Sequence, residues 1–262
     1  MEMTKWFDTN YHYLVPELHP DQNFRLSTDT LFNEIIEASA LGYRPKPVLL
    51  GPLTYLWLSK AKDKEFNRLD LLDRLLPVYR EICNRLAELN VDWVQIDEPA
   101  LVLELPAEWR RAYEHAYTAL SSTTLKLLLT TYFGGLHTNT ALACRLPVAG
   151  LHIDLIRAPH EVDHVLSQLA AGKVLSLGVV DGRNIWRTDL DDSLNSLENA
   201  RQQCGDGDIR FLRGEQNDVL RFMPPRHEGN KRAWWTAVIL AGPDKAKSPE
   251  LLAAFGKAVD SL

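Results

Sequence analysis

The chain has 262 residues, of which 45% are hydrophobic and 24% charged, as in an ordinary soluble globular protein, and its length suits one large domain or two small ones. The formal net charge is −6 and no basic block occurs, which argues against a nucleic-acid partner. No apolar run approaches the ~20 residues that span a bilayer, and the N-terminus lacks the apolar core of a signal peptide. We therefore expect a cytoplasmic protein without a membrane partner.

The three cysteines, Cys83, Cys144 and Cys204, are scattered and form no CxxC pair. The sequence therefore shows neither a disulfide framework nor a cysteine-based zinc motif. Cys83 lies in an apolar stripe with helical spacing, and we expect both Cys83 and Cys144 to pack in the core.

The first segment with a distinct pattern is WFDTNYHY at residues 6–13, which is dense in aromatic and polar side chains. Asn, His and Tyr side chains can hydrogen-bond and stack, which favours a binding surface. The same pattern fits an aromatic hairpin at a sheet edge, and the sequence leaves both interpretations open.

From residue 46 onward, short apolar runs alternate with amphipathic stretches. The apolar runs predict strands at residues 46–51, 93–98, 126–131, 150–155 and 174–180. The amphipathic stretches predict helices at residues 69–90, 108–120, 140–145, 161–170 and 190–203. Pro77 interrupts the first of these helices, and we expect a kink or a new first turn there.

This alternation predicts a parallel sheet of about five βα units with right-handed crossovers. Several predicted strands end in polar residues, namely Thr130, Thr131, Asp154 and Asp181. A polar rim at the carboxyl ends of the strands is typical of an α/β barrel, which needs about 250 residues. A doubly wound sheet would produce the same local pattern, but no glycine-rich phosphate loop follows any predicted strand. We therefore expect an α/β fold of the TIM-type (β/α)8 class.

The strand at residues 93–98 ends at two adjacent carboxylates, Asp97 and Glu98, and Pro99 then stops the ladder. The carboxyl end of a barrel strand faces the ligand, so Asp97 and Glu98 are candidates for ligand-facing residues. The alternative is that they accept backbone N–H bonds and brace the barrel mouth, which is the interpretation that we favour.

The pattern changes beyond residue 203. Residues 205–208, GDGD, predict a turn, and residues 224–232 predict a loop. Residues 234–240 are apolar, and residues 249–262 predict a terminal helix.

Five motifs in order resemble one enzyme family. They are MTKWFDTNYHY (3–13), PVLLGPLT (47–54), WVQIDEPAL (93–101), LLLTTYF (127–133) and GRNIW (182–186). The family is cobalamin-independent methionine synthase, the 5-methyltetrahydropteroyltriglutamate–homocysteine methyltransferase. The resemblance covers residues 1–203 and implies a partial N-terminal barrel domain, with residues 204–262 as an unmatched C-terminal tail.

The family has two related barrels, and the resemblance places this chain in the N-terminal one, which lacks the catalytic zinc. Thr130 and Tyr132 occupy the places of the His and Cys ligands of the catalytic barrel. Asp154 lies near the place of its Glu ligand, and Arg183 near that of its general-acid His. Threonine and tyrosine are poor zinc ligands, and one carboxylate cannot hold the ion. We therefore expect no catalytic residue, no metal site and no cofactor in this chain, zinc belonging to the full-length family.

The resemblance also assigns a role to Lys5, since the corresponding lysine of the family binds the polyglutamate tail of the folate. A lysine is a flexible point charge that suits a chain of carboxylates. Without the resemblance, Lys5 would be interpreted as a solvated surface lysine.

The first two barrel strands of the family lie upstream of the motif at residues 3–13, so the resemblance implies an incomplete barrel with two open edges. Packing of the apolar segment 234–240, self-association, or a partner with the catalytic half would each cover an edge. We expect the chain to be part of a methionine synthase and to be inactive alone. Whether the chain is itself an enzyme stays open. The alternatives are a folate-polyglutamate or partner-binding module, or a non-functional truncated product. A barrel like uroporphyrinogen decarboxylase would not explain the N-terminal motif.

Overall fold

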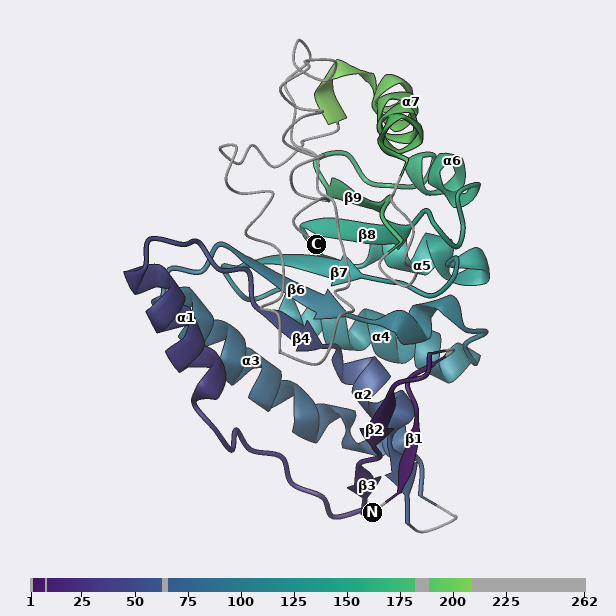
Figure 1. Ribbon diagram of the computed structural model, residues 1–262. Helices are drawn as coiled ribbons and strands as arrows, with labels where there is room; N and C mark the ends of the chain where they lie inside the picture. The colour runs from purple at the N-terminus through teal and green to yellow at the C-terminus, as the bar shows by residue number, and fades with distance from the viewer. Residues whose placement is uncertain (1, 8, 63–65, 182–188, 209–262) are drawn as a thin grey trace.

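The computed structural model describes residues 2–7, 9–62, 66–181 and 189–208. Its centre is a five-stranded sheet in the order β4-β6-β7-β8-β9, with every neighbouring pair parallel (Figure 1). The strands are β4 (Val48–Leu50), β6 (Trp93–Asp97), β7 (Lys126–Thr130), β8 (Gly150–Asp154) and β9 (Val174–Gly178). All five lie within predicted strands, and the predicted parallel sheet of five βα units is confirmed.

Helices follow the strands in sequence and cover one face of the sheet (Figure 1). They are α2 (Pro52–Leu58), α3 (Leu72–Glu88), α4 (Ala107–Leu120), α5 (Thr140–Arg145), α6 (Glu161–Leu166) and α7 (Leu190–Asp208). Short 3₁₀ turns precede or separate them, namely η1 (Arg68–Leu71), η2 (Pro99–Val102) and η3 (His137–Asn139). The arrangement is that of parallel strands with outer helices.

Strand side chains alternate between the two faces of the sheet, because successive residues of a strand project in opposite directions. The helix side carries the large core, to which the strands contribute Val94, Ile96, Leu127, Leu129, Leu151, Ile153, Leu175 and Leu177. Burial of each such side chain stabilises the fold by roughly 1.5–3 kcal/mol. The opposite face carries a much smaller apolar cluster of Trp93, Leu128 and Val174. The second face is therefore free to carry polar groups.

The sheet is open in the described part of the chain, with β4 and β9 as its edge strands. These strands and their outer helices form an incomplete barrel, as predicted. Val48 on β4 is a large exposed apolar side chain, and three others belong to α1 or to the segment between α1 and β4: Ile36, Leu41 and Tyr43.

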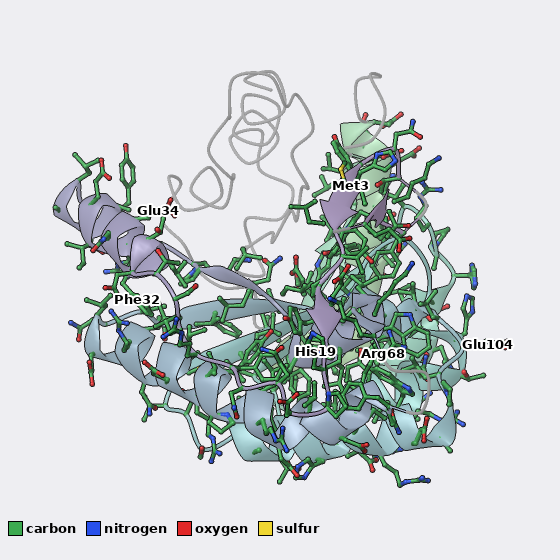
Figure 2. The ribbon with its side chains drawn as sticks, turned by 90° about the horizontal axis from the view of Figure 1, so that it is seen from below. Met3, His19, Phe32, Glu34, Arg68 and Glu104 are labelled. Carbon is green, nitrogen blue, oxygen red and sulfur yellow. The ribbon has the colours of Figure 1, made fainter. Side chains whose placement is uncertain are left out.

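The N-terminal segment forms a hairpin, in which β1 (Met3–Lys5) pairs antiparallel with β2 (His12–Leu14). Residues 6–13 therefore belong to a hairpin, as one interpretation expected, but this hairpin forms a two-stranded sheet of its own and is not the edge of the main sheet. A binding role for these residues stays a prediction. A short parallel pair, β3 (Glu17–Leu18) with β5 (Lys60–Ala61), and helix α1 (Thr30–Ala40) follow. Seen from below, α1 with Phe32 and Glu34 and the hairpin with Met3 lie at opposite sides of the molecule (Figure 2).

Several details differ from the predictions. Helices α1 and α2 were not predicted, although Pro52 at the first helical position is a start signal. Helix α3 continues through Pro77, so no new helix begins there, and a kink at Pro77 stays a prediction. The predicted turn at residues 205–208 is wrong, since α7 continues to Asp208. Glycine lowers helix stability by about 1 kcal/mol but does not by itself end a helix.

Cys83 and Cys144 are both 1% exposed within the main core, which confirms their predicted packing role. The interpretations of Arg183 and of residues 224–232, 234–240 and 249–262 concern positions outside the described residues. Within the described ranges, no helix combines the length and apolar character needed to cross a membrane.

Candidate functional site

Four polar side chains lie side by side across the sheet near the carboxyl ends of its strands. The register places Asp97 beside Thr130, and Thr130 beside His152. It also places His152 beside Ser176. Neighbouring strands lie about 4.8 Å apart, and paired residues project from the same face. These four residues, called the polar row below, project from the face opposite the helices, since their sequence neighbours belong to the helix-side core.

Asp97 is held by two side-chain donors. Gln95 Nε2 donates to its Oδ1 at 2.7 Å, and the Tyr132 hydroxyl donates to its Oδ2 at 3.1 Å. Lys46 Nζ donates to Gln95 Oε1 at 2.5 Å, so Gln95 links a cation to an anion. Burial raises the pKa of Asp97 to about 6, although both donors and Lys46 oppose the rise. Burial likewise lowers the pKa of Lys46 to about 8, against the attraction of Asp97.

His152 is a neutral member of the polar row. Its Nδ1 lies 2.9 Å from Ser176 Oγ. Burial, and then the positive charge of Lys46, lowers the pKa of His152 to about 3. The ring packs over Gly178, where an added Cβ would lie 3.1 Å from its Cε1 and Nε2 atoms. A glycine at this position is therefore what leaves room for the imidazole.

Thr130 lies between Asp97 and His152 in the polar row and is 1% exposed. Its Oγ1 has no hydrogen-bond partner among the described residues. The next residue, Thr131, projects from the other face and donates to the backbone oxygen of His152 at 2.9 Å. A buried hydroxyl without a partner costs about 1–3 kcal/mol, so its place in a native structure calls for an explanation such as a water or a ligand.

Glu98 lies on the helix side of the sheet and is fully buried. Its carboxylate accepts from the backbone N–H groups of Leu53 and Thr54, at 3.2 and 2.8 Å. The hydroxyls of Thr54, Tyr113 and Tyr117 also donate to it, at 2.6, 3.1 and 3.2 Å. Burial raises the pKa of Glu98 to about 7, although the donors oppose this. Glu98 thus joins β6 to the first turn of α2 and to α4.

Asp154, at the end of β8, accepts backbone N–H bonds on both oxygens. Phe133 donates to Oδ2 at 3.0 Å, while Ile156 and Arg157 donate to Oδ1 at 3.0 and 3.1 Å. These bonds tie the end of β7 to the loop after β8, which is a strand-end cap.

An aromatic cluster joins the N-terminal hairpin to the end of β7. The Phe7 ring centroid lies 5.5 Å from that of Phe133, and Trp6 lies 5.4 Å from Phe7 and 5.6 Å from Tyr13. Phe7 and Phe133 both have positive φ angles, 49° and 78°. Such conformations cost about 1–3 kcal/mol in bulky residues and concentrate at functional sites. The hairpin is thus fixed at the rim where the strands end.

Lys5 lies on β1 of this hairpin, opposite His12, and its side chain is exposed. It makes no hydrogen bond or ion pair with any described residue. The nearby Lys60, in contrast, is paired with Glu2 at 2.5 Å. Lys5 therefore offers an uncommitted positive charge within the described part of the rim.

The residues at the places of the zinc ligands do not fit a zinc ion. The Tyr132 hydroxyl is bonded to Asp97, and both Asp154 oxygens cap backbone groups. Thr130 supplies only a neutral hydroxyl, and zinc prefers thiolate, imidazole and carboxylate ligands. Across the ranges that the structure describes, no three His, Cys, Asp or Glu side chains gather where they could hold a metal.

The structure therefore separates the predicted site residues. Asp97 lies in the polar row, Glu98 lies on the opposite face, and Lys5 lies at the hairpin rim. Ligand contact by each of them stays a prediction. The sequence interpretation missed His152 and Ser176. Each is a polar residue in the middle of an apolar strand, and this pattern could have indicated them. The interpretation also missed Lys46, which shows no such pattern.

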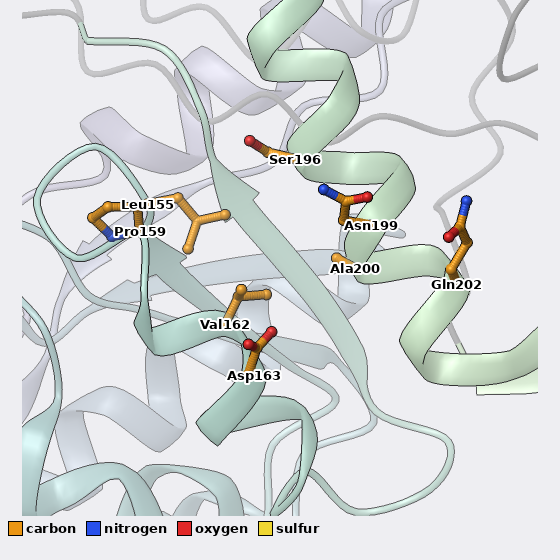
Figure 3. Close-up of a pocket in the computed structure, with 8 residues that line it drawn as sticks. All are labelled: Leu155, Pro159, Val162, Asp163, Ser196, Asn199, Ala200 and Gln202. Carbon is orange, nitrogen blue, oxygen red and sulfur yellow. The ribbon is translucent and has the colours of Figure 1, made fainter.

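A separate pocket of about 450 Å³ lies outside the sheet (Figure 3). It lies between helix α7, helix α6 and the loop that precedes α6. Its lining residues are Leu155, Pro159, Val162, Asp163, Ser196, Asn199, Ala200 and Gln202. None of them belongs to the polar row or to the hairpin, so this pocket is distinct from the strand-end site.

Solved structures share this fold. A B12-independent methionine synthase from Shewanella sp. W3-18-1, in complex with selenomethionine, matches with a TM-score of 0.62 and 12% identity, over 99% of this chain and 74% of that one. A putative vitamin-B12 independent methionine synthase from Listeria monocytogenes matches with a TM-score of 0.54 and 11% identity, over 92% and 71%. A methyltransferase from Methanosarcina mazei matches with a TM-score of 0.53 and 13% identity, over 87% and 62%.

At such identities these matches show the fold alone, an α/β fold of TIM-barrel type. The sequence itself matches the model of one family over residues 1–205, described as "Cobalamin-independent synthase, N-terminal domain". The matched region contains β1 to β9, the polar row and Lys5. This chain therefore belongs to the cobalamin-independent methionine synthase family and carries its N-terminal domain.

Proposed function

We propose that the chain is the folate-tail-binding domain of a methyltransferase that moves a methyl group from 5-methyltetrahydropteroyltriglutamate to homocysteine. The chemistry of methyl transfer belongs to a zinc-bearing half, and this domain holds part of the anionic tail. A cytoplasmic location is part of the proposal, since both substrates are metabolites of the cell interior. The observation that carries the proposal is the match to the family's N-terminal domain over residues 1–205.

The charges at the rim support this role. The tail of a triglutamate carries several carboxylates, and Lys5 presents an exposed ammonium on a hairpin that the aromatic cluster fixes at the rim. A lysine paired with a protein carboxylate, such as Lys60, would first have to break that pair. Lys5 makes no such pair with a described residue and can meet a carboxylate directly.

The donor set on the sheet supports the absence of catalysis by this chain alone. In a zinc methyltransferase the metal lowers the pKa of the substrate thiol and holds the nucleophile. Here Thr130, Tyr132 and Asp154 stand at the ligand places without fitting the ion. The domain is thus expected to bind the folate without transferring its methyl group.

Calorimetric titration of the purified chain with methyl-folate triglutamate and monoglutamate tests the proposal. We expect tighter binding of the triglutamate, and the difference should shrink as salt screens the tail charges. Equal affinity for both folates, or no binding of either, would contradict the proposal.

A second candidate function is association with another chain through the β4 edge. An edge strand presents unpaired backbone groups, and Val48 on β4 is an exposed apolar side chain, as are Ile36 and Leu41 of the preceding helix α1 and its end. We propose that this edge supports self-association, while a separate chain with the catalytic half is the alternative partner.

A further inference from the structure

We propose that the polar row binds a small, uncharged polyhydroxy compound on the face of the sheet opposite the helices. The site is distinct from the Lys5 rim and goes beyond the binding of a folate tail. It consists of Asp97, Thr130 and His152, with Lys46 and Gln95 on the β4 side.

The unpartnered hydroxyl of Thr130 is the observation that points to a ligand. It is buried and projects between Asp97 and His152 with no partner in the described residues. The His152 ring makes one hydrogen bond within those residues, through Nδ1 to Ser176. The row therefore still has hydrogen-bonding capacity at Thr130 on β7, and at His152 Nε2, which lies over Gly178 of β9.

The charges of the row select an uncharged ligand. Asp97 would repel an anion, and Lys46, which already opposes a positive charge on His152, would repel a cation. Gln95 joins the two charges, so the cation and the anion offset each other inside the site. No net charge remains in this set to neutralise an ionic ligand, whose desolvation would then go uncompensated.

The hydrogen-bond donors and acceptors of the polar row favour a ligand that carries hydroxyl groups. A hydroxyl both donates and accepts, so one hydroxyl can accept from Thr130 and another can bond to Asp97 or His152. Adjacent hydroxyls on a carbon chain or ring can bridge two side chains on neighbouring strands. Below the row on the same face, Leu128 and Val174 form an apolar floor against which C–H groups can pack.

The floor is tightly packed, which places the ligand at the level of the row. A Cβ on Gly150 would lie 2.9 Å from Leu128 Cδ1 and 3.1 Å from the backbone oxygen of Val174. No space is left at Gly150 beneath the polar row. Gly178 adds no side chain beside His152, so the imidazole ring fills the space above it.

Equilibrium dialysis of the full chain against labelled glucose and myo-inositol tests the proposal, with glucuronate and glucosamine as charged counterparts. We expect one-to-one saturable binding of at least one neutral compound and weaker binding of both charged ones. Thr130→Val preserves the shape of the side chain and removes the hydroxyl, and it should weaken binding about tenfold. Thr131→Val, whose hydroxyl lies on the other face, is the matched control and should bind as the wild type does.

The free protein supplies a second readout. Because Thr130→Val removes an unpartnered buried hydroxyl, it should unfold at a higher urea concentration than the wild type when no ligand is present. Three results would overturn the proposal: no saturable binding of either neutral compound, equal binding of a charged counterpart, or unchanged binding by Thr130→Val. Lys5→Gln should leave glucose binding unchanged, which separates this site from the folate-tail site.

Discussion

Asp97 and Glu98 are consecutive residues, yet their carboxylates lie on opposite faces of the sheet. Asp97 bonds to Gln95 and Tyr132 in the polar row, whereas Glu98 accepts from groups of α2 and α4. The alternation of strand side chains produces this division. The two acids of the motif therefore have different tasks, and only Asp97 lies on the face where we propose that a ligand binds.

Glu98 should make the stability of the fold depend on pH. Its folded pKa of about 7 lies above the ordinary value of 4.5, so the native state binds more protons than the unfolded chain between these pH values. The stability contributed by this group is therefore highest below pH 4.5 and declines as pH rises toward about 7. By linkage the decline is on the order of 3 kcal/mol.

Urea unfolding of the wild type and Glu98→Gln at several pH values measures this effect. We expect the free energy of unfolding of the variant to lose the decline across that window. Glu104→Gln, at an exposed glutamate in the same connection, should keep the wild-type profile. A variant profile parallel to that of the wild type would show that Glu98 does not titrate in this range.

The tyrosines around Glu98 should stabilise the fold through their hydroxyls. Tyr113→Phe and Tyr117→Phe each remove a donor to a buried carboxylate, and each should lower the free energy of unfolding by about 1.5–3 kcal/mol. Tyr55→Phe is the matched control, because its hydroxyl has no partner among the described residues, and it should change little. If all three variants lost the same free energy of unfolding, the cause would be changed packing rather than lost hydrogen bonds.

Local patterns predicted the sheet but not the site on it. The strands β6 to β9 can be predicted from the sequence, because each is a short apolar run followed by an amphipathic stretch. Helix α2 was not predicted, because its residues LTYLWL are apolar almost throughout and show no apolar stripe with helical spacing. The polar row depends on register, which places His152 beside Thr130 across 22 residues of sequence, and no local pattern encodes that pairing. Glu98 accepts backbone N–H bonds, as the favoured interpretation of the motif expected, but the sequence did not show that its partners belong to α2.

The purified chain should form no methionine. We expect no product when it is incubated with zinc, methyl-folate triglutamate and homocysteine, because the residues at the ligand places do not fit the metal. Methionine is quantified by mass spectrometry, with folate binding by the same sample as the control for a folded protein. Turnover above the rate without protein would refute this prediction.

Lys5 should contribute to affinity through charge. Lys5→Gln should weaken binding of methyl-folate triglutamate by several fold, as expected for one exposed ionic contact of about 1 kcal/mol or less, and should leave the monoglutamate unaffected. Lys126→Gln is the control, since Lys126 begins β7 at the opposite end of the strands and pairs with Asp92. Isothermal calorimetry at low salt measures both. An equal loss in the two variants would point to a general effect of net charge.

The β4 edge should make the chain self-associate. Val48, on the edge strand, is 51% exposed, and Leu41, at the end of α1, is 68% exposed; apolar surface of this kind favours contact between chains. Sedimentation velocity should therefore show a mean mass that rises with protein concentration. The double variant Leu41→Lys, Val48→Lys should sediment as a monomer, because a lysine on an edge strand opposes pairing.

Ile156→Lys, at an exposed apolar residue after β8, is the control and should associate as the wild type does. A wild type that stays monomeric at all concentrations, or a double variant that associates unchanged, would place any interface elsewhere.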